Sequence, residues 1–281
     1  MVGGMIRGMQ PFLAALVVLA GADSAAAAVG AWGQGQRAEA RIVAAGIGAD
    51  GTLNAGVEIG LPDGWHTYWR TPGDAGVAPT IDFSASGNLG PAAVSFPVPT
   101  RLDDGFSVTN VYKANVVLPV NAAVIDRSRP VDLVARLAIG VCSDVCVPDT
   151  IEARLTIPAG ENDAAAAATL ADAGKAVPGA AESGVFALAA IIRTGGTEGR
   201  PVFRVTGTVP DAANATMFVE GPEGWAAYTP DYRPGNQADG GKDAWTVQFD
   251  RLGAHTPIAG AAFRFTIVSG DRAIDQTLTL Q

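Results

Sequence analysis

The sequence predicts an all-β protein built from two antiparallel β-sandwich domains, and three observations support this fold class. Short segments that alternate apolar and polar residues recur along the chain. The 35 Gly and 18 Pro residues suit frequent turns and show no collagen-like period. Helical patterns are almost absent between the segments, which favours antiparallel sandwiches over an α/β fold. A hydrophobic fraction of 48% and a net charge of −9 argue against a disordered chain.

The amino terminus has the layout of a secretory signal peptide, which we assign to residues 1–28. Arg7 gives a weakly basic start, Pro11–Ala20 form an apolar run, and Ala25–Ala28 supply small residues for cleavage. A membrane span needs about 20 apolar residues, so this run is too short to be one. The alternative is a buried or anchoring helix. Export would place the mature protein outside the cytoplasm, where disulfides persist, with no membrane span.

The first β domain is expected over residues 31–160. Its clearest predicted strands are Arg41–Ile47, Leu53–Leu61, Asn115–Val124, Val131–Val141 and Ile151–Ile157. Clusters of turn-forming residues, such as Pro62–Gly64 and Pro72–Asp74, separate the alternating segments. We therefore expect the stretch Gly64–Gly76 to be rich in turns.

The composition changes over residues 161–180, which we interpret as an Ala-rich helix and linker. Glu161–Ala176 predicts a short helix, and Pro178–Gly184 predicts a linker. The β pattern then resumes in a second domain, residues 181–281. Its predicted strands are Val185–Arg193, Val202–Val209, Thr216–Glu220, Trp245–Asp250, Phe263–Val268 and Ile274–Leu280.

Charge and composition exclude several classes of function. The acidic balance argues against nucleic acid as a partner. Two cysteines cannot form a disulfide-dense scaffold or a four-thiolate zinc site. Two histidines far apart in the sequence leave little for metal or triad chemistry. We therefore expect no cofactor and no metal site, and the role of the two cysteines becomes the main question.

The two cysteines, Cys142 and Cys146, lie four residues apart between two strand-like segments. This placement predicts a hairpin whose tip brings the two thiols together. A disulfide there would close a loop of about five residues and stabilise the fold by roughly 2 kcal/mol, at the low end for disulfides. A disulfide between close neighbours in the chain stabilises the fold only slightly. The pair therefore has the features of a reactive site more than of a structural cross-link.

Spacing alone leaves three roles open for this pair. A lone pair of cysteines in an exported protein is most often a structural disulfide, and redox exchange and metal binding are the alternatives. The spacing differs from the C-x-x-C of thioredoxin-like enzymes, and no helix amino terminus is expected beside the thiols. We therefore expect no strongly oxidising enzyme. A relay that exchanges electrons with a more reactive partner fits the pattern better.

A second cluster contains the aromatic residues Trp65, Tyr68 and Trp69 together with His66. Large aromatic side chains usually fill cores, so one interpretation is a cluster at the edge of the core. The other interpretation is a cap or docking surface that shields the disulfide and offers a partner apolar contact. His66 would tune a nearby thiol in that case, although a lone histidine is more often only hydrogen-bonded.

Four motifs in a fixed order resemble a known family. They are Gly64–Gly76, Phe96–Arg101, Tyr112 with Val116–Val120, and Val141–Pro148. Together they resemble the periplasmic amino-terminal region of the DsbD/ScsB thiol–disulfide interchange proteins, over about residues 40–158. The resemblance is strongest to the ScsB-like branch associated with copper tolerance.

The resemblance implies an immunoglobulin-like sandwich that carries a redox pair, with Cys142 and Cys146 as the catalytic residues. It implies that Cys146 forms the mixed disulfide with a partner and that Cys142 resolves it. The residues Trp65, His66, Tyr68 and Trp69 match the aromatic motif of the family, and Tyr112 matches an aromatic before the Val-Leu-Pro strand. We infer a role in capping or docking for these five residues.

The expected function is a soluble periplasmic relay and component of a protein-disulfide reductase, tied by the resemblance to copper tolerance or cytochrome c biogenesis. The sequence shows no membrane domain and no thioredoxin-like domain. Its partner would therefore be a membrane-embedded thiol–disulfide transporter or a thioredoxin-like periplasmic protein. One segment departs from the family, because Gly105–Asn115 lacks the glycine-tyrosine-glutamate run that precedes the Val-Leu-Pro strand. We therefore do not assign acid–base help to this loop. The alternative function is a copper(I)-binding or structural interaction module, since soft thiolates select Cu(I).

Overall fold

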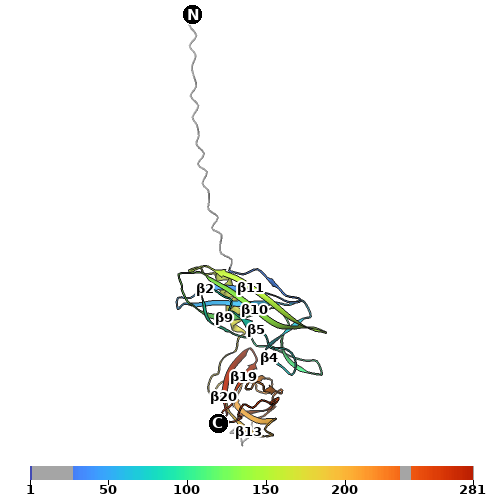
Figure 1. Ribbon diagram of the computed structural model, residues 1–281. Coiled ribbons are helices and arrows are strands. Elements are labelled where there is room, and N and C mark those ends of the chain that lie inside the picture. Colours follow the sequence, from blue (N-terminus) through green and yellow to red (C-terminus); the bar gives the residue numbers. More distant parts are fainter. Residues whose placement is uncertain (2–27, 235–241, 281) are drawn as a thin grey trace.

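The computed structural model describes residue 1, residues 28–234 and residues 242–280. The predicted signal peptide falls on residues 2–27 and so lies almost wholly outside the described part of the chain. Figure 1 shows two β bodies, which we call the first sandwich (strands β1–β11) and the second sandwich (strands β12–β20). The prediction of two β-sandwiches joined near one short helix is therefore confirmed.

The first sandwich consists of two antiparallel sheets. One has the order β1-β2-β3-β9-β6, and the other has the order β11-β10-β4-β8-β7 with β5 paired to β10. The strands are β1 Gly33–Gln34, β2 Glu39–Ile47, β3 Thr52–Gly60, β4 His66–Gly73, β5 Thr80–Asp82, β6 Leu89–Val94, β7 Thr100–Asp103, β8 Val108–Tyr112, β9 Val116–Val124, β10 Val131–Cys142 and β11 Cys146–Ile157. Both sheets contribute apolar side chains to one core, including Leu53, Val57, Leu118, Leu133 and Leu137.

The alternation of the sequence explains these strands. In β11 buried and exposed side chains alternate along nearly the whole strand, and every second residue from Asp149 onward is buried. The five strands expected in this domain are all present. The expectation for Gly64–Gly76 was wrong, because most of it forms β4, a strand in the interior of its sheet. Pro72 is tolerated there because the pairing of β4 with β8 is irregular between Tyr68 and Gly73, so no regular ladder hydrogen bond is required of it.

The predicted helix is α1, Ala164–Lys175. The Asp163 side chain accepts a hydrogen bond from the Ala166 backbone N–H (2.7 Å) and so caps its first turn. Ala166 and Leu170 pack against Val43 and Ala45 of β2, which fixes the helix on the first sandwich. The linker that follows also contains a short strand, β12 (Gly179–Ala180), which the sequence did not predict and which pairs in parallel with β20.

The second sandwich also has two sheets, ordered β12-β20-β19-β15 and β13-β14-β18-β16, with β17 paired to β18. Its other strands are β13 Ala187–Gly196, β14 Pro201–Thr208, β15 Thr216–Glu220, β16 Ala226–Ala227, β17 Asp231–Arg233, β18 Asp243–Asp250, β19 Ala262–Ser269 and β20 Arg272–Thr279. Its core is rich in aromatic rings, among them Phe203, Phe249 and Phe263, which contact one another. Across the described ranges, no helix is long and apolar enough to cross a membrane.

Candidate redox site

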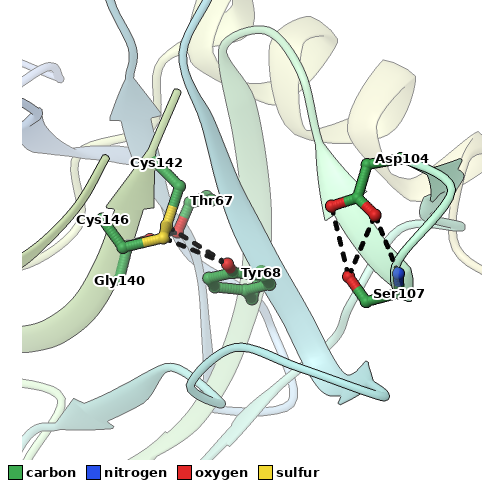
Figure 2. Close-up of a disulfide and its surroundings, with 7 residues drawn as sticks. All are labelled: Thr67, Tyr68, Asp104, Ser107, Gly140, Cys142 and Cys146. Atoms are coloured by element: carbon green, nitrogen blue, oxygen red, sulfur yellow. Dashed lines mark hydrogen bonds between the residues drawn. A yellow bond between two sulfur atoms is a disulfide. The ribbon is translucent and has the colours of Figure 1, made fainter. Parts of the chain in front are cut away.

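The two cysteines form a disulfide at the tip of the β10–β11 hairpin (Figure 2). Cys142 ends β10, Cys146 begins β11, and the two residues are direct partners in the antiparallel register, with Cα atoms 4.1 Å apart. The Ser143 backbone N–H donates to the Val145 carbonyl (3.0 Å) and closes the three-residue turn between them. The predicted hairpin tip is therefore confirmed, and the two thiols are joined.

The two sulfur-bearing residues differ in exposure. Cys142 is 1% exposed, whereas Cys146 is exposed to solvent. The cause is the strand order, because β10 lies between β11 and β4, and Cys142 is the register partner of His66 on β4. Cys146 lies on β11, the outermost strand of the sheet. An incoming thiolate can therefore reach Cys146, while the rest of the sheet shields Cys142.

Tyr68 on β4 is the polar neighbour of the disulfide (Figure 2). Its hydroxyl lies 3.1 Å from the Cys142 Sγ and 3.6 Å from the Cys146 Sγ. A disulfide sulfur carries no hydrogen, so the tyrosine O–H must be the donor. The adjacent Thr67 hydroxyl donates to the Gly140 carbonyl (2.8 Å) in a buried position, which ties β4 to β10 beside the disulfide.

The ring of Tyr68 lies in a slot between two glycines. A Cβ on Gly140 would come within 3.1 Å of the ring, and a Cβ on Gly76 would come within 2.3 Å of it. Gly76 also has a φ of +103°, which L-residues with side chains rarely adopt. Glycine is therefore required on the Gly76 side of the ring, whereas a side chain on the Gly140 side would make the ring shift by a few tenths of an ångström. The packing of the Tyr68 ring therefore explains why the motif that contains Tyr68 ends with a glycine at position 76.

The surroundings favour the uncharged forms of Tyr68 and His66. Burial raises the pKa of the Tyr68 phenol, and the negative charge of Asp104 raises it further. Hydrogen bonds from the backbone N–H groups of Phe106 (2.9 Å) and Ser107 (2.8 Å) lower the pKa of Asp104 and keep it ionised. Burial, with a smaller contribution from Lys113, lowers the pKa of His66. Tyr68 therefore remains a hydrogen-bond donor toward the sulfurs.

The other aromatic residues of the predicted site divide into two groups. His66 packs edge-on against Tyr68, with ring centroids 5.6 Å apart, and Trp65 is half-buried under the Arg37 guanidinium. Trp69 is fully buried, and Tyr112 is buried with its hydroxyl donating to the Pro97 carbonyl (2.7 Å). Trp69 and Tyr112 therefore occupy the core. For Trp69, this is the alternative that the sequence left open for its cluster.

Three exposed apolar residues near the site were not singled out from the sequence. Val145 is in the tip of the hairpin, and the Val77 side chain lies beside Gly140 and thus next to Tyr68. Phe106 is 100% exposed in the loop between β7 and β8, and the same loop carries Asp104 and Ser107 opposite Tyr68 in Figure 2. A lone phenylalanine inside the polar turn Asp103–Ser107 was the available signal. Across the described part of the chain, no group of three or more His, Cys, Asp or Glu side chains is arranged to hold a metal ion.

The fold and the site define a β-sandwich domain with a solvent-accessible disulfide at a hairpin tip. Residues 36–158 match the family model described as thiol:disulfide interchange protein DsbD, N-terminal. The match covers less than half of the chain and confirms the resemblance found in the sequence. No curated protein matches the chain.

A solved structure also resembles both sandwiches together. The crystal structure of the N-terminal periplasmic domain of ScsB from Proteus mirabilis matches with a TM-score of 0.69 and 22% sequence identity. The match covers 90% of this chain and 98% of that chain. At this identity the likeness shows a shared fold, and the coverage indicates that the fold includes the second sandwich.

Proposed function

We propose that this protein is a periplasmic thiol–disulfide relay that exchanges electrons through Cys142 and Cys146. The observation that carries the proposal is the asymmetry of the disulfide. Cys146 is exposed to solvent, whereas Cys142 is buried and its sulfur is the nearer of the two to the Tyr68 hydroxyl. The family of residues 36–158 and the signal-like amino terminus support the chemistry and the compartment. The ScsB domain of the same fold is itself periplasmic.

Reduction of the pair proceeds in two displacements. A thiolate of the electron donor attacks the Cys146 sulfur, the Cys142–Cys146 bond breaks, and Cys142 leaves as a thiolate. The Tyr68 hydroxyl, 3.1 Å from the Cys142 sulfur, stabilises the negative charge that develops there. A second thiol of the donor then attacks the mixed disulfide and releases Cys146. Two electrons move to the pair, and the donor leaves as a disulfide. The reduced pair repeats the sequence in reverse on an oxidised substrate, with Cys146 as the attacking thiolate.

The partner would contact the apolar residues around the hairpin tip. Val145, Val77 and Phe106 are exposed there, His66 on β4 is the register partner of Cys142, and Trp65 directly precedes His66 in the chain. Apolar and aromatic side chains of this kind are typical anchors of protein interfaces. The partners that suit the chemistry are a membrane-embedded thiol–disulfide transporter as donor and a thioredoxin-like periplasmic protein as acceptor.

A redox titration tests the proposed function. The mature protein is equilibrated in glutathione buffers of defined ratio, and its thiols are counted by alkylation and mass spectrometry. We expect a reduction potential between about −300 and −120 mV, the range of exchange-active disulfides. A potential below about −300 mV would mean a structural bond and would contradict the relay.

Substitution of Tyr68 by phenylalanine should slow reduction of the disulfide by dithiothreitol about tenfold at pH 7. The reason is the loss of a hydrogen bond to the leaving Cys142 sulfur, and a hydrogen bond of about 1.4 kcal/mol corresponds to this factor. The rate is measured by quenched alkylation. Tyr112→Phe is the matched control. It also removes a buried tyrosine hydroxyl, but that hydroxyl donates to the Pro97 carbonyl and not to a sulfur. Equal rates for the two variants would show that Tyr68 only fills space.

A further inference from the structure

Strand β4 leaves its ladder immediately after Tyr68. The register with β8 pairs Tyr68 with Val111 and resumes at Gly73, which pairs with Thr109. The intervening residues, 69–72, therefore form a bulge that has more residues than the facing part of β8. A bulge of this kind redirects side chains away from the regular sheet. Here it begins at the residue that follows the tyrosine of the redox site.

The Arg70 side chain in this bulge extends into the second sandwich. Its Nε and Nη2 donate to the Glu220 Oε1 (2.9 and 2.7 Å), and Nη2 also reaches the Thr266 hydroxyl (2.9 Å). The Asp275 carboxylate lies 3.4 Å from the same nitrogen. The side chains of Arg70, Glu220 and Asp275 are each less than one-fifth exposed. Removing one partner of an ion pair that is shielded from water costs more than removing one partner of a surface pair, because the remaining charge is left uncompensated.

An aromatic contact strengthens the same junction. Phe218 of β15 is 3% exposed and packs into the core of the first sandwich, with its ring centroid 5.4 Å from that of Trp69. The Arg101 guanidinium lies 4.9 Å from the Phe218 ring and donates to the Met217 carbonyl (2.7 Å). The second sandwich therefore contacts the bulge at two consecutive residues, Trp69 through Phe218 and Arg70 through Glu220.

The chain then returns from the bulge to the redox site. The Asn110 side chain donates to the Thr71 carbonyl (2.9 Å), and the Val108 N–H donates to the Asp74 carboxylate (3.0 Å). Two residues later Gly76 lies against the Tyr68 ring. The stretch between Tyr68 and Gly76, which forms one side of the ring slot, is thus fastened to the second sandwich near its beginning, at Trp69 and Arg70.

We propose that Arg70 is a positioning residue and that the second sandwich, through Glu220 and Phe218, sets the place of the Tyr68 hydroxyl against the Cys142 sulfur. The second sandwich would then control the exchange rate of the disulfide through the bulge and Tyr68. This inference rests on the proposed role of Tyr68 in exchange. Arg70 acts through the bulge and through the tyrosine, and it contacts neither sulfur.

The test is a double-mutant cycle on the full chain, with the rate of reduction by dithiothreitol at pH 7 as the readout. Arg70→Gln should slow the reaction about fivefold, and Arg70→Lys should recover part of the loss. The double variant with Tyr68→Phe should be no slower than Tyr68→Phe alone, because both substitutions remove the same hydrogen bond. Arg41→Gln is the matched control, because Arg41 also pairs with a partly buried glutamate (Glu58) and covers a tryptophan.

Each outcome has a defined meaning. The inference is supported if Arg70→Gln slows reduction of the otherwise unchanged protein but does not slow it further when Tyr68→Phe is already present. An unchanged rate in Arg70→Gln, or full additivity of the two substitutions, overturns it even if Tyr68→Phe alone slows exchange as proposed. An effect of Arg41→Gln equal to that of Arg70→Gln also overturns it. If Arg70→Gln fails to fold by circular dichroism, Glu220→Gln replaces it in the cycle under the same criteria. A reduction potential below about −300 mV would instead remove the proposed function itself.

Discussion

In the Cys142→Ala variant, Cys146 should form a mixed disulfide with glutathione disulfide at least about tenfold faster than Cys142 does in the Cys146→Ala variant. The remaining thiol of Cys142→Ala is exposed at the start of the outermost strand, whereas the remaining thiol of Cys146→Ala is 1% exposed beneath Tyr68. A buried thiol reacts only after local opening of the hairpin, and an opening free energy of about 1.4 kcal/mol already gives tenfold. Mass spectrometry of quenched samples measures both rates.

The same two variants identify the partner. Cys142→Ala lacks the thiol that would resolve the mixed disulfide, so a covalent adduct with an exchange partner should accumulate in this variant. Cys146→Ala serves as the matched control because it also retains one thiol. Both variants should melt within a few degrees of each other, since each loses the same short-loop disulfide. A faster reaction of Cys142, or adducts of equal yield in both variants, would reverse the roles assigned to the two sulfurs.

The hairpin was predictable because its determinants are local. Alternation over Val131–Val141 and Ile151–Ile157 defines two strands, and their short separation leaves Cys142 and Cys146 opposite each other. The difference in exposure between the two cysteines was not predictable from these residues. It depends on β4, which is distant in sequence and covers only the β10 side of the hairpin.

Strand β4 itself shows why local patterns were insufficient. Pro72 and Gly73 favour a turn by their own preferences, but the ladder accommodates them through a bulge in which Arg70 is hydrogen-bonded to the second sandwich. The partner of Arg70 is Glu220, and no periodicity connects residues so far apart in the chain. The slot for Tyr68 is similar, since Gly76 precedes Gly140 by a long stretch. Tertiary contacts therefore determined the parts of the site that the sequence left open.

Substitution of Trp69 by alanine should lower the free energy of unfolding by about 3–5 kcal/mol, the usual loss for a fully buried large aromatic residue. Trp69 fills the space between the first sandwich and Phe218, and the Arg70 guanidinium lies 4.0 Å from its ring. Trp65→Ala is the matched control on the same motif. It should cost clearly less, because Trp65 is only half-buried.

The shape of the unfolding curve carries additional information. If Trp69 and Phe218 couple the two sandwiches, the wild-type protein should unfold in urea as one transition, whereas Trp69→Ala should show two. Tryptophan fluorescence and far-UV circular dichroism, recorded on the same samples, would separate the two bodies, since Trp225 and Trp245 report on the second sandwich. A single transition retained in Trp69→Ala, with a loss no larger than that of Trp65→Ala, would show that Trp69 is a packing residue without a role in the junction. The exchange rate of the disulfide in Trp69→Ala should fall with the loss of coupling, because the same bulge positions Tyr68.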